Sequence, residues 1–274
     1  MKKLAILGVG LMGGSLAKAV KRRFPDVLIS GYARSVESYE KLKKLKFIDH
    51  VECELKAAVA DADYVVLGIP IFAMERYMQA IAPFLKSGAV VFDLGSTKEL
   101  IEKWAKKYLP KNVTFVGCHP LCGSEKAGAQ NSVDNLYHGA LCIITADEKS
   151  PKAREIKSFW EKLDSRVVFM PAKKHDRMLA AISHLPHLIS FSLMNSVEEE
   201  YLRFAPPSLK DMTRIAASPV DVWSDIFLSN KKEMIKAVEK YRKFLGVMES
   251  AIRRGDRVAL EKLISDAHKK RGGI

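Results

Sequence analysis

Residues 3–14, which read KLAILGVGLMGG, decide the fold of this protein. The apolar run Leu4 to Leu7 is typical of a buried strand, and residues 11–23 carry apolar side chains at helical spacing. The pattern Gly-x-Gly-x-x-Gly lies between them. It predicts a turn whose backbone N–H groups, with the N-terminus of the following helix, bind the pyrophosphate of a dinucleotide. The expected cofactor contacts are Gly8, Gly10, Leu11, Met12 and Gly13.

Apolar runs and helical patterns alternate from this turn as far as residue 170. The alternation predicts a parallel sheet with right-handed crossovers, and so a Rossmann-type, doubly wound α/β domain over residues 1–170. Two apolar runs at 140–146 and 166–170 flank an expected helix at 151–163, and we expect both to extend the same sheet. The other expected strands are 4–7, 27–32, 64–68, 89–93 and 114–117, and the other expected helices are 11–23, 36–45, 73–85 and 98–108.

The pattern changes at Pro171, after which the sequence contains no convincing strand. Long amphipathic segments occupy residues 173–203, 208–218, 220–245 and 255–270. We therefore expect a second, all-α C-terminal domain over residues 171–274.

Composition and charge exclude several classes of protein. Hydrophobic residues make up 48% and charged residues 28% of the 274 residues, which argues against intrinsic disorder. No apolar run approaches the roughly 20 residues of a membrane-spanning helix, so we expect no membrane partner. The 45 Lys and Arg exceed the 32 Asp and Glu, but they are spread along helical segments without a basic arm. We interpret this charge as a solvated surface or a preference for anionic small molecules, and we expect no nucleic-acid partner.

The cysteines and histidines bear on redox state and metal binding. Cys53, Cys118, Cys122 and Cys142 form no Cys-x-x-Cys pair, and no histidine cluster has the spacing of zinc ligands. We therefore expect reduced thiols, no metal and a cytoplasmic location.

The end of the second expected strand bears on the choice of cofactor. NAD-selective sites carry Asp or Glu there to bind the ribose 2′-hydroxyl, whereas residues 31–35 read GYARS and contain no acid. The guanidinium of Arg34 and the hydroxyl of Ser35 suit a 2′-phosphate, so the sequence favours NADP over NAD. The alternative is that Arg34 only caps a surface turn and stacks on adenine. Ile69 and Pro70, which follow the third expected strand, complete the expected cofactor site.

Ser96 and His119 follow the fourth and fifth expected strands. Because ligands of doubly wound sheets bind beyond the carboxyl ends of the strands, we expect both side chains on neighbouring loops of the dinucleotide crevice. A histidine beside a nicotinamide can take a hydroxyl proton while hydride leaves the same carbon, and a serine can orient its imidazole. The structural alternative for His119 is a turn histidine held in place by Pro120.

Five motifs occur in order along the chain. They are the glycine turn, DLGSTK at 93–98, HPLCGSEK at 119–126, SHLPH at 183–187 and DMTRIA at 211–216. Together they resemble the prephenate dehydrogenase family, which includes arogenate and cyclohexadienyl dehydrogenases. The similarity runs from about residue 3 to residue 250, so it covers both halves of the chain.

This resemblance implies an activity and roles for several residues. The implied reaction is the NAD(P)-dependent oxidative decarboxylation of prephenate to 4-hydroxyphenylpyruvate in tyrosine biosynthesis, or alternatively of arogenate directly to tyrosine. His119 then accepts the proton of the ring hydroxyl, Ser96 bonds to His119 and that hydroxyl, and Arg214 holds a substrate carboxylate. His187 lines the substrate pocket. The family forms dimers through its helical domain, which implies a homodimer here, and no metal is implied.

Further residues lie in or near these motifs. Asp211 precedes Arg214 by one helical turn and is placed to hold its guanidinium, with a plain surface pair as the alternative. His184 shares a helix side with His187, and it either contacts the substrate or is a buried core histidine. Trp223 either walls the ring pocket or fills the core. The residues expected to contact the substrate or Arg214 after the histidine motif are Ser124, Glu125 and Lys126.

Two features bear on regulation. Residues 205–209 read APPSL where the family often has a glycine-rich segment, so we expect a stiffer loop there. The sequence leaves no room for an ACT domain or a chorismate mutase segment, so we expect a monofunctional enzyme.

Two other functions compete with this one. A β-hydroxyacid dehydrogenase shares the two-domain plan, but its catalytic lysine lies on a helix after the boundary, and Lys173 and Lys174 lie too near the domain junction. A regulator that binds NADP without turnover is the non-enzymatic alternative. Ser96, His119 and Arg214 favour an enzyme, because a sensor needs neither a base beside the nicotinamide nor an anion clamp.

Overall fold

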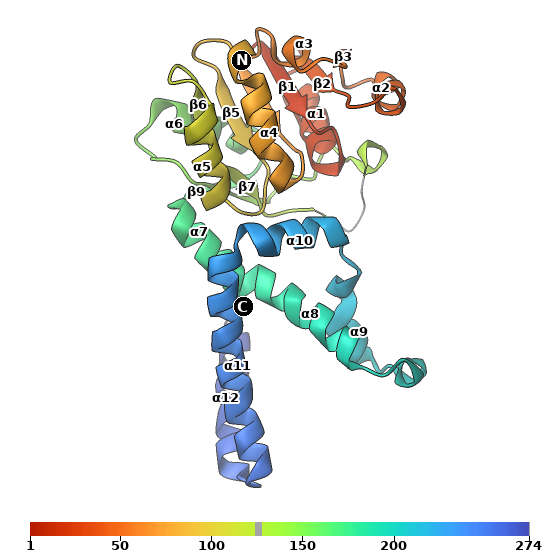
Figure 1. Ribbon diagram of the computed structural model, residues 1–274, viewed down its shortest axis with the longest axis vertical. Helices are drawn as coiled ribbons and strands as arrows, with labels where there is room; N and C mark the ends of the chain where they lie inside the picture. Colours follow the sequence, from red (N-terminus) through yellow and green to blue (C-terminus); the bar gives the residue numbers. More distant parts are fainter. Residues whose placement is uncertain (124–127, 274) are drawn as a thin grey trace.

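A six-stranded parallel sheet forms the centre of the N-terminal half, in the order β3-β2-β1-β4-β5-β6 (Figure 1). The structure is a computed structural model that describes residues 1–123 and 128–273. The chain runs from β1 outward to one edge and then crosses to the other, which confirms the doubly wound topology predicted from the sequence. The strands are β1 (Lys3–Leu7), β2 (Leu28–Tyr32), β3 (His50–Glu52), β4 (Tyr64–Leu67), β5 (Val90–Asp93) and β6 (Thr114–Val116).

Helices cover both faces of this sheet. They are α1 (Leu11–Arg23), α2 (Val36–Lys43), α3 (Leu55–Val59), α4 (Ile71–Ile81), α5 (Glu99–Tyr108) and α6 (Pro151–Lys162), with 3₁₀ turns η1 (Ala82–Phe84) and η2 (Ala129–Asn131). In β1, Leu4 and Ile6 belong to one hydrophobic core, while Ala5 and Leu7 belong to the other, because successive strand side chains point to opposite faces. Burial on both faces explains why β1, β4 and β5 are continuous apolar runs in the sequence.

A separate three-stranded sheet follows β6. It contains β7 (Cys118–Pro120), β8 (Leu141–Ile144) and β9 (Arg166–Phe169), so the prediction that residues 140–146 and 166–170 extend the first sheet was wrong. The chain leaves the first sheet at Gly117, where a Cβ would lie 2.4 Å from Oγ1 of Thr145. β7 pairs antiparallel with β8, and β8 pairs parallel with β9. His119 therefore lies within a strand and not on a loop.

The C-terminal half is helical, which confirms the predicted fold class. Its helices are α7 (Ala172–Leu179), α8 (Leu185–Ser196), α9 (Pro207–Thr213), α10 (Val220–Ser229), α11 (Lys231–Arg253) and α12 (Arg257–Arg271), with 3₁₀ turns η4 (Glu199–Phe204) and η5 (Arg214–Ala217). Helix α10 packs on α4 and α7 packs on α5, whereas α11 and α12 form a hairpin that projects away from the sheet (Figure 1). Within the described ranges, no helix has both the length and the hydropathy needed to cross a bilayer.

Two of the expected long helices are divided. A π-helical turn, η3 (Ala180–His184), separates α7 from α8, whose second residue is Pro186. Proline has no N–H to continue an α-helical hydrogen-bond ladder, so a change in helix type is favoured here. Asn230, with φ −108° and ψ 26°, separates α10 from α11. These two breaks bring Nδ2 of Asn230 to 3.3 Å from Nδ1 of His184 at the junction of the two halves.

Candidate active site

The glycine turn between β1 and α1 has the geometry of a phosphate-binding turn. Gly8 has a φ of +99°, and a Cβ there would lie 2.3 Å from the carbonyl oxygen of Gly68, in the loop after β4. A Cβ at Gly13 would lie 2.2 Å from the carbonyl oxygen of Gly8, so both positions require glycine. By contrast, apart from its own chain neighbours, no atom of the described residues lies within 4 Å of a Cβ built at Gly10, which precedes α1. Gly10 thus leaves the N-terminus of α1 open, and the turn fits a dinucleotide.

Four further cofactor candidates surround this turn. Leu11 and Met12 begin α1 and are half-buried. Ile69 and Pro70 follow β4, and Cγ2 of Ile69 lies 2.8 Å from a Cβ built at Gly8. Because β1 and β4 are neighbours, the two loops adjoin at the point where the strand order reverses, which is where doubly wound sheets bind ligands.

Arg34 and Ser35 lie at the carboxyl end of β2, and both are exposed. Oγ of Ser35 accepts a hydrogen bond from the N–H of Ser38 at 3.2 Å, so Ser35 is the N-cap of α2. In the described part of the chain, the guanidinium of Arg34 forms no ion pair. The end of β2 therefore presents an unpaired cation, while the hydroxyl of Ser35 has a structural partner.

His119 is the first member of a buried hydrogen-bonded series. Its Nδ1 lies 2.8 Å from Nε2 of His175, and Nδ1 of His175 lies 2.7 Å from Oδ1 of Asp176. The two oxygens of Asp176 also accept the backbone N–H groups of Lys98 and Glu99, at 2.8 and 2.9 Å, at the N-terminus of α5. Burial lowers the pKa of His119 well below 6.5 and also lowers the pKa of His175, so both imidazoles are neutral near pH 7.

His175 and Asp176 were not predicted from the sequence. Both belong to the buried stripe of α7, which consists of Ala172, His175, Asp176 and Leu179 at helical spacing. A histidine and an aspartate at positions that otherwise carry apolar residues are the signal that identifies them, because buried polar groups require partners.

Ser96 lies on the loop between β5 and α5 and is half-buried. Among the described residues it makes no hydrogen bond to His119, so the bond expected from the sequence is absent, and Nδ1 of His119 bonds to His175 in its place. The loop itself is fixed by Asp93, which accepts the N–H groups of Gly95 at 2.9 Å and Cys118 at 3.1 Å. Asp93 also forms a fully buried ion pair with Lys98. These bonds tie the Ser96 loop to β7.

His187 and Trp223 form a stacked pair in the helical half. Their ring centroids are 3.5 Å apart and their planes differ by 19°. Nδ1 of His187 lies 3.0 Å from the carbonyl oxygen of Ser183, which leaves Nε2 available for a ligand. Burial lowers the pKa of His187, and the nearby charge of Arg214 lowers it further. Trp223 therefore backs the His187 ring, as a pocket wall does.

His184 is fully buried, which argues against direct contact with substrate. Burial lowers its pKa to about 4, and its Nε2 is buried without a hydrogen-bond partner in the described structure. Its ring centroid lies 6.2 Å from that of Trp223, and protonation of His184 would lower the pKa of His119 further. His184 thus lies between the His119 series and the His187 pair.

Arg214 is exposed at the first residue of η5. The described residues contain no ion pair between Arg214 and Asp211, so the expected clamp on the guanidinium is absent. Among the described residues, contacts through His187, Trp223 and His184 connect Arg214 with His119. The expected positions Ser124, Glu125 and Lys126 lie outside the described residues.

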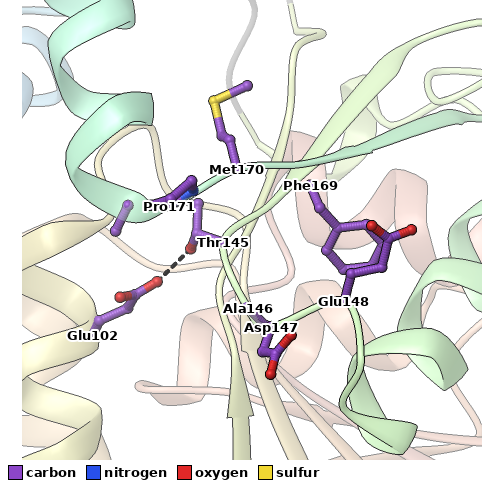
Figure 2. A pocket seen from close by; sticks show the side chains of 9 residues that line it. Glu102, Thr145, Ala146, Asp147, Glu148, Phe169, Met170 and Pro171 are labelled. Atoms are coloured by element: carbon purple, nitrogen blue, oxygen red, sulfur yellow. Dashed lines mark hydrogen bonds between the residues drawn. The ribbon is translucent and has the colours of Figure 1, made fainter.

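A cavity of about 460 Å³ lies at the junction of β9 and α7 (Figure 2). Figure 2 shows Thr145 bonded to Glu102 of α5 on one side, with Glu148 and Phe169 on the other. It is lined by Glu102, Thr145, Ala146, Asp147, Glu148, Phe169, Met170, Pro171 and Ala172. None of the site residues predicted from the sequence lines it, so this cavity is not the proposed active site.

Comparison with known protein families agrees with the geometry. The family described as prephenate dehydrogenase, nucleotide-binding domain, matches residues 16–169, and the prephenate dehydrogenase dimerization domain matches residues 171–266. The cyclohexadienyl dehydrogenase of Zymomonas mobilis is 33% identical over 279 residues, which cover 98% of this chain and 95% of that protein. The prephenate dehydrogenase of Bacillus subtilis is 28% identical, over 99% of this chain and 76% of that protein.

Solved structures agree as well. Prephenate dehydrogenase from A. aeolicus, in complex with hydroxyphenyl propionate and NAD⁺, superposes with a TM-score of 0.91 at 32% identity, covering 100% of this chain and 98% of that one. Arogenate dehydrogenase from Synechocystis has a TM-score of 0.82 at 23% identity over 99% of each chain, which shows the shared fold alone. The chain belongs to the prephenate dehydrogenase family of NAD(P)-dependent oxidoreductases.

Proposed function

We propose that this protein catalyses the oxidative decarboxylation of prephenate to 4-hydroxyphenylpyruvate, a step of tyrosine biosynthesis. Arogenate, which has an amino group in place of the keto oxygen of the side chain, is the alternative substrate and yields tyrosine directly. The observation that carries the proposal is a neutral, buried imidazole, His119, which directly follows the sheet whose glycine turn fits a dinucleotide.

His119 acts as the general base in this mechanism. Because Nδ1 is bonded to His175, Nε2 is the nitrogen that accepts the proton of the C4 hydroxyl. A bound nicotinamide supplies the acceptor for the C4 hydrogen, which leaves as hydride. The C1 carboxylate leaves as carbon dioxide, its bonding electrons complete the aromatic ring, and the proton returns from Nε2 to the phenolic oxygen. Ser96, on the adjoining loop, is proposed to bond to the hydroxyl once substrate is present.

The helical half is proposed to hold the substrate. Arg214 is exposed and free of an ion pair within the described ranges, so its guanidinium can bind a substrate carboxylate through two parallel N–H bonds. His187, backed by Trp223, lines the ring pocket, and the buried His184 supports that wall from behind. Ser124, Glu125 and Lys126 complete the proposed set.

The proposed cofactor is NADP in preference to NAD. Its contacts are proposed along the glycine turn and the adjoining Ile69 and Pro70. Arg34 is an exposed cation at the end of β2, where no carboxylate stands to receive a ribose 2′-hydroxyl. Ser35 already caps α2, so Arg34 is the main group proposed to bind the 2′-phosphate.

The domain division and the assembly are proposed as follows. Residues 1–170 form the dinucleotide-binding domain, and residues 171–274 form a substrate-binding and dimerisation domain. The proposed location of the enzyme is the cytoplasm. Helix α11 supports a homodimer because it exposes large apolar side chains, among them Phe244, Leu245 and Ile252, each more than half exposed at 56%, 51% and 64%.

One assay tests the function. Prephenate and arogenate are each combined with NADP and NAD, and the absorbance of the reduced nicotinamide is followed. Rapid turnover of prephenate, faster with NADP, is the expected result. Turnover of arogenate alone would favour the alternative substrate, and cofactor binding without turnover of either would favour a regulator.

A further inference from the structure

We propose that His175 and Asp176 are positioning residues that fix the tautomer of His119, leaving Nε2 of His119 as the unprotonated base. The inference rests on the proposed function only in naming His119 as the base. The hydrogen-bond geometry of the three side chains carries the rest.

Asp176 determines which ring nitrogen of His175 carries the proton. Its Oδ1 accepts the N–H of Lys98 and its Oδ2 accepts the N–H of Glu99, so the carboxylate is aligned with the N-terminus of the ten-residue helix α5. A carboxylate only accepts hydrogen bonds. Nδ1 of His175, which lies 2.7 Å from Oδ1, must therefore carry a proton and donate a hydrogen bond to Oδ1.

The tautomer of His175 in turn determines the tautomer of His119. The His175 ring is fully buried, and its pKa is lowered by burial and by the charge of Lys98, against the opposing effects of Asp176 and Asp93. A neutral imidazole that carries its proton on Nδ1 offers only an acceptor at Nε2. Nδ1 of His119 must therefore donate across the 2.8 Å contact, and Nε2 of His119 is left with a free lone pair.

The series crosses the boundary between the two halves of the chain. His119 lies on β7 and the backbone donors lie at the start of α5, whereas His175 and Asp176 lie on α7. Asn230, between α10 and α11, donates from Nδ2 to the carbonyl oxygen of Asp176 at 2.8 Å. The base therefore has its correct tautomer only when the helical half is docked on the sheet.

The decisive measurement is the protonation of the His119 ring in the full chain, with neither substrate nor cofactor. Long-range ¹H–¹⁵N correlation spectra of protein labelled at its seven histidines distinguish protonated from unprotonated ring nitrogens. The resonances of His119 are identified by their loss in His119→Asn. We expect the proton on Nδ1 of His119, and a proton on Nε2 in the wild-type protein would overturn the proposal without any variant.

Asp176→Leu tests the source of the tautomer. A leucine side chain accepts no hydrogen bond, so a proton on Nδ1 of His175 loses its acceptor; His175 is expected to move its proton to Nε2, and His119 is expected to gain a proton on its own Nε2. With turnover dependent on a free Nε2, kcat should fall by about 100-fold or more while KM for cofactor changes little. His175→Phe keeps a ring in place and removes both bonds, and we expect a mixture of His119 tautomers. Unchanged His119 spectra in both variants would overturn the proposal.

Asp63→Leu is the matched control. Asp63 also accepts two backbone N–H groups, those of Lys2 at 2.5 Å and Lys3 at 3.3 Å, but it precedes β4 at the amino edge of the sheet. This variant should lose stability with no change in the His119 spectrum. The two proposals also separate: a wild-type protein with the expected tautomer that does not oxidise prephenate or arogenate contradicts the proposed function and supports the role of His175 and Asp176.

Discussion

The two halves of the molecule build their parts of the proposed site in different ways. In the N-terminal half, the glycine turn is held by close backbone contacts, since a Cβ at Gly8 would lie 2.3 Å from the carbonyl oxygen of Gly68, and His119 lies within strand β7. In the helical half, Arg214 lies exposed on a four-residue 3₁₀ turn and His187 is half-buried. The difference teaches that the cofactor turn is positioned by the backbone, whereas substrate affinity and the orientation of the base depend on side chains. Substitution of His119 should therefore change kcat, and substitution of Arg214 should change KM.

His119→Asn should have the largest effect. Loss of a positioned base should lower kcat by about 100-fold or more, while the Kd for the reduced cofactor, measured by fluorescence titration, stays within about twofold. His268→Asn, on the exposed end of α12, is the control. Unchanged turnover in His119→Asn would remove the proposed role of the N-terminal half in proton transfer.

Arg214→Ala tests how much the helical half contributes to substrate binding. Loss of a charge-assisted hydrogen bond worth about 2 kcal/mol should raise KM for prephenate by about 30-fold with little change in kcat. Arg214→Lys should restore part of the affinity, because it keeps the charge but not the paired N–H donors. Arg253→Ala, whose side chain pairs with Glu249 on α11, is the control. A prephenate KM that stays at the wild-type value in Arg214→Ala would contradict the clamp.

Acid should destabilise the junction of the halves, where His119, His175 and His184 are buried with lowered pKa values, before it affects the amino edge of the first sheet at Asp63. The pKa of His184 is about 4 in the folded chain and near 6.5 when unfolded, so the unfolded chain binds more protons between these values. Stability present above pH 6.5 is therefore lost as the pH falls toward 4, by about 2 kcal/mol at pH 5. Asp63, whose pKa is lowered to about 2, loses its contribution only below about pH 3.8.

Thermal melts at pH 7 and pH 5 check this prediction. The fall in Tm between the two should be smaller in His184→Gln than in the wild type, and His268→Gln should match the wild type. An equal fall in all three proteins would show that burial of His184 does not couple folding to pH.

Arg34→Asp should have the smallest effect and should be confined to cofactor choice. An acid at the end of β2 suits a ribose 2′-hydroxyl and repels a 2′-phosphate, so the NADP/NAD ratio of kcat/KM should fall by about tenfold, or 1.4 kcal/mol. KM for prephenate should not change. An unchanged NADP/NAD ratio of kcat/KM would mean that Arg34 does not bind the 2′-phosphate and only caps the surface turn.

The strands of the N-terminal half differ in how far the sequence predicts them. The strands around Leu4 to Leu7 and the glycine turn follow from local patterns, and the predicted fold class is confirmed. Strand β3 was missed because His50 is exposed and Val51 and Glu52 are half-buried, so this short edge strand has no apolar run. The second sheet was placed wrongly because an apolar run does not specify which strand it pairs with.

The sequence by itself determined the alternation of the main strands and helices, the need for glycine at the cofactor turn and the chemical types of most site residues. These follow from hydrophobic periodicity and backbone sterics, which act between near neighbours. Only the tertiary structure decided that Nδ1 of His119 bonds to His175 and not to Ser96, and that Asp176 bonds to the start of α5. A hydrogen bond requires its two atoms to come within about 3 Å of each other, and for segments that are distant along the chain, packing of the two halves sets that distance.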